Sequence, residues 1–151
     1  MNQTATLNDI RRSFFRIMQD AVTEEESTGR LYVVPPAQDG NPDIKSMMLI
    51  SGFIPGQTTR GEMGGYGALA IREGVWKMTV SFLRDTDAGE PWELAQKLED
   101  TFTPYTVDGI PVNDALCHVF CDFPYSEDVG ELPDKRNGIS VTVPWWTWTS
   151  N

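Results

Sequence analysis

Apolar residues recur at helical spacing over residues 7–23 and form one stripe. The stripe consists of Leu7, Ile10, Phe14, Ile17, Met18 and Val22. We predict an amphipathic helix here, with Asn8 as the N-terminal cap and Thr6 as the alternative cap. An acidic run at residues 24–26 follows the stripe. Because acids near a helix C-terminus oppose the macrodipole, we expect the helix to fray and end there.

Later segments alternate between apolar and polar residues, which is typical of half-buried strands. Residues 74–84 predict a strand whose apolar face consists of Trp76, Met78, Val80 and Phe82. Residues 139–148 predict another, with an inner face of Ile139, Val141, Val143 and Trp145 and an outer face that includes Ser140 and Thr142. Residues 115–123 predict a third, in which one face is shared by Cys117, Val119, Cys121 and Phe123.

Other elements are read from less regular patterns. Residues 44–54 predict a strand, and residues 68–72 predict another that is separated from the strand at 74–84 by Glu73 and Gly74. This pair is interpreted either as a hairpin turn or as a bulge inside one long strand. Glycine-rich residues 55–67 and acidic residues 124–137 are expected to be loops.

A second helix is predicted over residues 90–102, after an acidic turn. Pro91 suits the first helical turn, where its missing N–H costs nothing. The apolar stripe of this helix consists of Leu94, Ala95, Leu98 and Phe102. Because strands do not alternate regularly with helices, the order predicts an α+β fold, with a largely antiparallel sheet and two main helices packed on one face.

Length and charge narrow the possible functions. The chain has 151 residues, which favours a single domain over residues 1–151. It carries 22 acidic and 12 basic residues, a formal net charge of −10. Nucleic-acid binding requires clustered Lys and Arg, so specific binding to DNA or RNA is disfavoured. The sequence contains neither a secretory signal nor a membrane span, so we expect synthesis in a reducing cytoplasm and no membrane partner.

The acidic turn before the second helix contains the strongest candidates for metal ligands. Asp85, Asp87 and Glu90 could offer oxygens to Mg²⁺ or Ca²⁺. The same carboxylates suit a helix N-terminus, where they accept hydrogen bonds from backbone N–H groups. We favour this capping role, and we expect no bound metal and no cofactor.

Other chemistry-bearing residues give weaker signals. His118 is the only histidine, and strand alternation places it opposite Cys117 and Cys121. The two cysteines would lie about 13 Å apart on one strand, too far for a disulfide. The glycines at positions 61, 64, 65 and 67 lack the Gly-Lys-Ser/Thr ending of a phosphate loop. We therefore expect a protein that is not an enzyme.

Two apolar segments are candidates for a subunit interface. Met47, Met48 and Ile50 belong to a continuous apolar run, which can indicate burial on both faces or an intersubunit contact. Trp146 and Trp148 would point away from the side of the strand that carries Trp145. Exposed tryptophans are favoured at interfaces, although a second small core is an alternative.

The order of elements resembles that of tail terminator, or tail completion, proteins of long-tailed bacteriophages. The resemblance rests on the N-terminal amphipathic helix, the segment 74–82 (GVWKMTVSF) leading into the turn 85–90 (DTDAGE), and the helix ending at Phe102. It continues through residues 108–112 (DGIPV) and the final strand. It covers residues 7–23 and 74–148, and a loop or arm insert at about residues 28–67 is longer than the pattern leads us to expect.

The resemblance implies a virion protein made in the host cytoplasm. Such proteins are α+β subunits that form a homo-oligomeric ring, usually hexameric, at the head-proximal end of the tail tube. The ring stops polymerisation of the tail tube protein and docks the head connector or neck proteins, while DNA passes through its lumen without specific binding. A neck or head–tail joining protein is the nearest alternative. A small metal-dependent enzyme, or a ligand-binding α+β domain whose Trp cluster lines a pocket, are others.

Overall fold

The computed structural model describes residues 6–35, 47–60, 69–84, 87–112, 118–133 and 135–150. The helices of this part are α1 (Leu7–Ala21), α2 (Thr23–Ser27), α3 (Gly89–Phe102) and the 3₁₀ helix η1 (Thr103–Thr106). The strands are β1 (Leu31–Val33), β2 (Met47–Arg60), β3 (Leu69–Phe82), β4 (Phe120–Cys121), β5 (Tyr125–Glu131) and β6 (Asn137–Ser150). Strands pair in the order β1-β2-β3-β6-β4, and β5 also pairs with β6.

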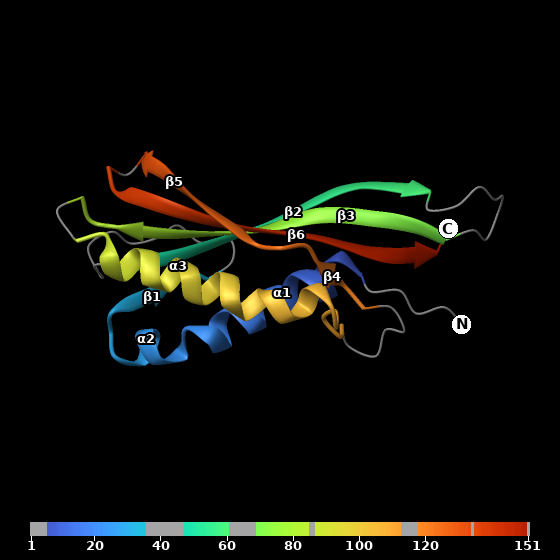
Figure 1. Cartoon of the computed structure of the whole chain (residues 1–151), viewed down its shortest axis with the longest axis horizontal. Helices are drawn as coiled ribbons and strands as arrows, with labels where there is room; N and C mark the ends of the chain where they lie inside the picture. The colour runs from blue at the N-terminus through green and yellow to red at the C-terminus, as the bar shows by residue number, and fades with distance from the viewer. Residues whose placement is uncertain are drawn as a thin grey trace.

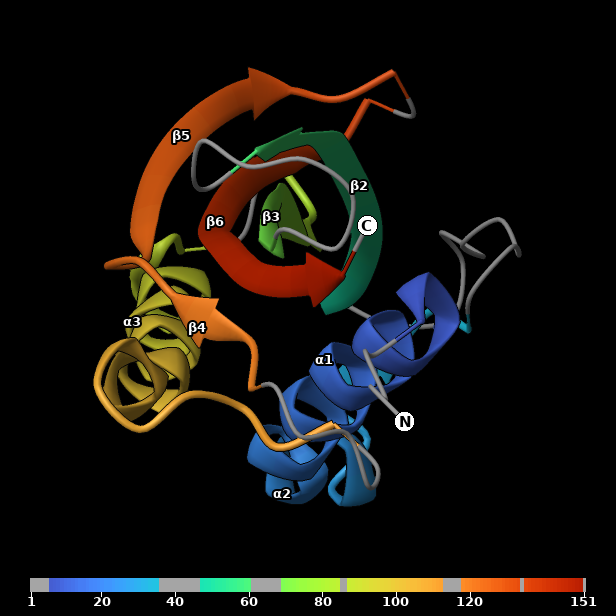
Figure 2. The same ribbon diagram turned by 90° about the vertical axis from the view of Figure 1, so that its right-hand side faces the viewer.

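The predicted α+β fold is confirmed. Among the described strand pairs only β1 and β2 run parallel, and the others are antiparallel. Figure 1 shows β2, β3 and β6 as three long strands, with α1 and α3 lying along one face of the sheet. Figure 2 shows that the sheet curves strongly while both helices stay on the same side of it.

The core lies between the two helices and the sheet, and its centre is aromatic. The ring of Phe14 on α1 stacks on Trp76 of β3 and Phe102 of α3, at centroid distances of 5.6 and 5.7 Å. It also lies 6.3 Å from Trp145 of β6. All four side chains are buried. One side chain of α1 therefore joins both helices to the two central strands, and the apolar faces predicted for residues 76–82 and 139–145 are confirmed.

Strand β3 runs without interruption through Glu73 and Gly74, so the hairpin-turn interpretation is wrong. Its register with β6 is continuous from Leu69 to Phe82. The irregularity lies instead on the neighbouring strand, between Pro55 and Thr58 of β2. Proline lacks the N–H that the ladder needs, which explains why the bulge forms there.

The N-terminal cap of α1 is Thr6, so the preference for Asn8 was wrong. The Thr6 Oγ1 accepts from the Asp9 backbone N–H at 3.1 Å, and the Asp9 carboxylate accepts from the Thr6 N–H at 3.4 Å. This reciprocal pair is a capping box, which satisfies two helix-end donors. Asn8 instead accepts a hydrogen bond from the Arg11 guanidinium.

Thr6→Ala is expected to lower the free energy of unfolding by about 1 kcal/mol, because the Asp9 N–H loses its acceptor. Asn8→Ala should change it by less than half as much, since it removes only an exposed side-chain contact. Urea denaturation of both variants provides the measurement. Equal losses in the two variants would contradict the assignment of Thr6 as the cap.

The end of the first helix also differs from the expectation. α1 ends at Ala21, and the acidic run does not fray but forms the short helix α2. Glu24, Glu25 and Glu26 lie in the first turn of α2. Carboxylates there face the positive end of a new helix dipole, which explains why the run is helical.

Two further predictions for the second half of the chain differ from the structure, one of them only in part. Within the predicted acidic loop 124–137, Tyr125–Glu131 form the strand β5. Acidic side chains are common on edge strands, where they discourage pairing with other molecules. Of the predicted strand 115–123 the structure describes residues 118–123, where Phe120–Cys121 form β4, Val119 makes an isolated bridge with Ile110, and Phe123 is 74% exposed. Phe123 follows the end of β4 and precedes Pro124, so strand alternation no longer fixes its direction.

Residues 28–67 contribute more to the sheet than a loop or arm would. β1 lies within this segment, and β2 extends to Arg60, well beyond the predicted strand end at residue 54. Residues 36–46 and 61–67 lie outside the described part, so the rest of the insert stays a prediction.

Candidate interaction surface

The sheet has an outer face, defined here as the face turned away from α1 and α3. Trp145 packs into the core, so the neighbouring residues of β6 point to the outer face. There Trp146 stacks on Phe120 of β4 at 5.0 Å, and its ring meets the edge of Trp148 at 6.0 Å. All three side chains are only partly buried. We call Phe120, Trp146 and Trp148 the aromatic patch.

A groove of about 590 Å³ lies beside this patch. We call it the sheet groove, and its lining residues are Ile54, Gly56, Glu73, Gly74, Val75, Asp122, Pro144, Trp145 and Trp146. Ile54 is 54% exposed, an unusual value for an isoleucine in the middle of a strand. Together the groove and the aromatic patch make an apolar surface with carboxylates beside it, which is a composition suited to protein–protein contact.

The floor of the groove depends on a glycine. A Cβ added to Gly74 would lie 2.4 Å from Cζ2 of Trp145 and 2.8 Å from the carbonyl oxygen of Ile54. The position therefore admits no side chain while the Trp145 ring stays in place. The groove was not predicted from the sequence. Gly74, which lies between two alternating apolar stretches, could have indicated it, because an isolated glycine in a strand often marks the close approach of another group.

The other predicted interface residues lie away from this surface. Met47 is 2% exposed and belongs to the core, and Met48 is 1% exposed. Neither offers a contact surface in the folded subunit as described, while Ile50 is partly buried. Ser140 and Thr142, which were predicted to face out, are both buried. The accessible half of the outer face is therefore the half that carries Trp146 and Trp148.

The acidic turn has structural partners for its described members. The Asp87 Oδ1 accepts from the Gly89 backbone N–H at 3.0 Å, next to the start of α3. The Glu90 Oε1 lies 3.4 Å from Nη1 of Arg30. Asp85 lies outside the described residues. Among the residues that the structure describes, no group of three His, Cys, Asp or Glu side chains could hold a metal ion.

The remaining chemistry candidates are described only in part. Cys121 is buried, and this burial together with the charge of Asp122 raises the pKa of its thiol to about 12. A thiol with that pKa is protonated at neutral pH and a poor nucleophile. His118 is exposed, and its backbone carbonyl accepts from the Thr147 hydroxyl at 2.9 Å. Cys117 and the glycines at 61–67 lie outside the described residues.

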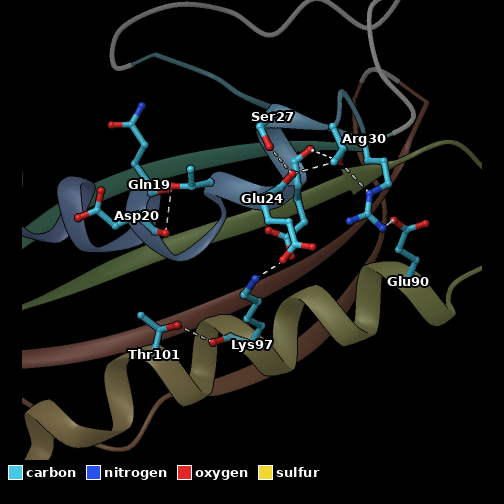
Figure 3. A network of polar contacts seen from close by, with 11 residues as sticks. Gln19, Asp20, Glu24, Ser27, Arg30, Glu90, Lys97 and Thr101 are labelled. Carbon is cyan, nitrogen blue, oxygen red and sulfur yellow. Dashed lines mark hydrogen bonds and ion pairs between the residues drawn. The ribbon is translucent and has the colours of Figure 1, made fainter.

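A polar network holds the two helical segments together on the other side of the sheet. The Lys97 Nζ of α3 donates to the Glu25 Oε1 of α2 at 2.7 Å. Arg30 reaches Glu90 at the start of α3. Figure 3 shows Lys97 and Glu90 rising from α3 toward the end of α2. This network fixes the acidic α2 against a helix of the core.

The pKa of Glu25 is lowered from its ordinary value of 4.5. Burial acts to raise it, but the hydrogen bond and charge of Lys97, with backbone hydrogen bonding and Arg30, outweigh that effect. Because the pKa is lower in the folded state, this ion pair stabilises the fold above about pH 4.5, and the contribution is lost as the pH falls through the folded-state pKa.

Lys97→Met is therefore expected to cost about 0.5–1 kcal/mol of unfolding free energy at pH 7, since the pair is partly exposed. The difference from the wild type should shrink as the pH is lowered below 4.5, because Glu25 then becomes protonated in both proteins. Urea denaturation at a series of pH values measures this difference in unfolding free energy. Glu26→Gln is the control on the same helix. A pH-independent difference would refute the role assigned to Lys97.

Comparison with known proteins supports the fold and leaves the function open. No family model and no curated protein matches the chain. A solved structure whose name states no function aligns with 95% of this chain and 96% of its own, with a TM-score of 0.65 and 13% sequence identity. At that identity the likeness shows a shared fold. No helix among the described residues is long and apolar enough to cross a membrane.

Proposed function

We propose that this chain is a tail terminator of a long-tailed bacteriophage, a virion protein that assembles as a ring, hexameric by resemblance, at the head-proximal end of the tail tube. The ring stops polymerisation of the tail tube protein and docks the head connector. The observation that carries the proposal is the partly exposed aromatic patch beside the sheet groove, because part of this apolar surface stays accessible in a single subunit.

The physical reason lies in the cost of exposed aromatic surface. Tryptophan rings provide large apolar area and are enriched at the centres of protein interfaces. Trp146 and Trp148 also lie on a long, fully paired strand, so little ordering is needed when they bind a partner. These properties support an assembly subunit over an isolated monomer.

Charge and local chemistry support the same proposal. A net charge of −10 disfavours adhesion to DNA, as a ring that surrounds passing DNA requires. The two described carboxylates of the acidic turn are engaged by Gly89 and Arg30. That engagement supports a structural role for the turn, and we infer that the chain acts without catalysis.

Size-exclusion chromatography with light scattering tests the ring. We expect the wild type to elute as an assembly several times the subunit mass of 16.9 kDa. In the double variant Trp146→Ala, Trp148→Ala the measured mass should shift toward that of one subunit. Trp92→Ala is the matched control, because Trp92 is 40% exposed but lies on α3. A wild type that stays monomeric at high concentration would contradict the proposal.

A further inference from the structure

The exposed side of α1 is the second unusual surface of this acidic protein. Three of the twelve basic residues of the chain, Arg11, Arg12 and Arg16, lie there within six positions. They line a shallow hollow of about 310 Å³ together with Asp9, Ser13, Phe15 and Gln19. Arg12 and Arg16 are exposed, and neither has an ion-pair partner in the described part of the chain. We call Arg11, Arg12 and Arg16 the arginine face.

The sheet groove has the complementary composition. Glu73 and Asp122 are exposed carboxylates in its lining, without ion-pair partners among the described residues. Trp146 lines the same groove. A guanidinium can bind a carboxylate through two parallel hydrogen bonds and stack on an indole ring, which a lysine does less well.

We propose that the sheet groove of one copy receives the arginine face of a second copy. The inference rests on the proposed ring and names the surfaces that form it. Arginines of α1 pair with Glu73 and Asp122 across the contact, and Trp146 stacks against a guanidinium.

The fold makes this contact heterologous. Arg12 and Arg16 are on the exposed side of α1, and α1 covers one face of the sheet (Figures 1 and 2). The groove lies on the other face, to which Trp146 points. Each copy therefore binds one neighbour through its arginine face and another neighbour through its sheet groove. Such head-to-tail contacts build rings when the rotation closes and filaments when it does not.

Charge reversal in two variants tests the contact directly. The first variant is Arg12→Glu with Arg16→Glu, and the second is Glu73→Arg with Asp122→Arg. Each variant alone should lose assembly and run near 16.9 kDa in light scattering, because like charges then face each other. An equimolar mixture should recover assembly, since copies that alternate restore every pair. Alternation closes only rings with an even number of subunits, such as a hexamer.

Matched controls separate the contact from general charge effects. Lys135→Glu and Glu93→Arg reverse exposed charges away from both surfaces and should leave assembly unchanged. Circular dichroism and the melting temperature must show that all variants fold.

The possible results lead to different conclusions. Folded charge-reversal variants that still assemble would overturn this contact and leave the proposed ring in place. Two folded variants that stay monomeric even when mixed would also overturn it. A wild type that never assembles would overturn both the ring and the contact.

Discussion

Gly74→Ala is expected to destabilise the fold by about 3 kcal/mol, at the upper end of what overpacking costs. The added Cβ would meet Trp145 Cζ2 at 2.4 Å and a backbone oxygen of β2 at 2.8 Å. Neither neighbour moves easily, because the Trp145 ring is stacked on Phe53 at 5.5 Å and buried in the core. Relief of the clash requires β3 to separate from β2 or the indole to leave its place.

Gly52→Ala is the matched control. Gly52 lies on β2 in the same sheet, and a Cβ there would meet nothing within 4 Å. Alanine also restricts the unfolded chain more than glycine does, so this variant should be neutral or more stable by a few tenths of a kcal/mol. Urea denaturation of both variants measures the difference. A Gly74→Ala protein as stable as Gly52→Ala would show that the groove floor is not rigid.

Phe14→Ala is expected to cost about 3–5 kcal/mol of unfolding free energy, the usual range for a buried phenylalanine. The ring contacts Trp76, Phe102 and Trp145, which come from three different elements. Its removal leaves a cavity that large stacked rings cannot readily fill. Because the stability of a folded domain is about 5–15 kcal/mol, this substitution should remove a large part of it.

Phe15→Ala provides the comparison for Phe14. Phe15 is the next residue of α1 and is only partly buried against the core. Both variants replace phenylalanine with alanine in the same helix, so the change in helix propensity is the same. The difference in stability between them therefore measures the contribution of core packing. In thermal denaturation followed by circular dichroism, the melting temperature of Phe14→Ala should be well below that of Phe15→Ala. Similar melting temperatures would mean that the aromatic centre of the core is not the main support of α1.

The periodic segments could be predicted from the sequence because burial fixed their pattern. Residues 139–145 alternate since one side packs on α3, and residues 94–102 follow helical spacing for the same reason. β5 could not be predicted in this way. Its residues are almost all exposed, so no apolar alternation marks the strand, and its place depends on pairing with β6. Ser140 shows the opposite case. Its polar side chain predicted an outward-facing position, but the residue is buried.

The candidate surface was predictable only in part. Strand alternation placed Trp146 and Trp148 opposite Trp145, and the structure agrees. The groove combines residues from β2, β3 and β6 with Asp122, and their register is a tertiary property that no local pattern contains. Met47 and Met48 were predicted as interface residues only because they belong to a continuous apolar run. The same run is produced by a strand that is buried on both faces.

The central claim, that this protein ends a tail tube, is tested most directly by electron microscopy of negatively stained tubes. The cognate tail tube protein is polymerised alone and in the presence of this protein carrying a gold label. The proposed function predicts shorter tubes with label at one end only. Label along the tube walls, or tubes of unchanged length with unlabelled ends, would contradict it.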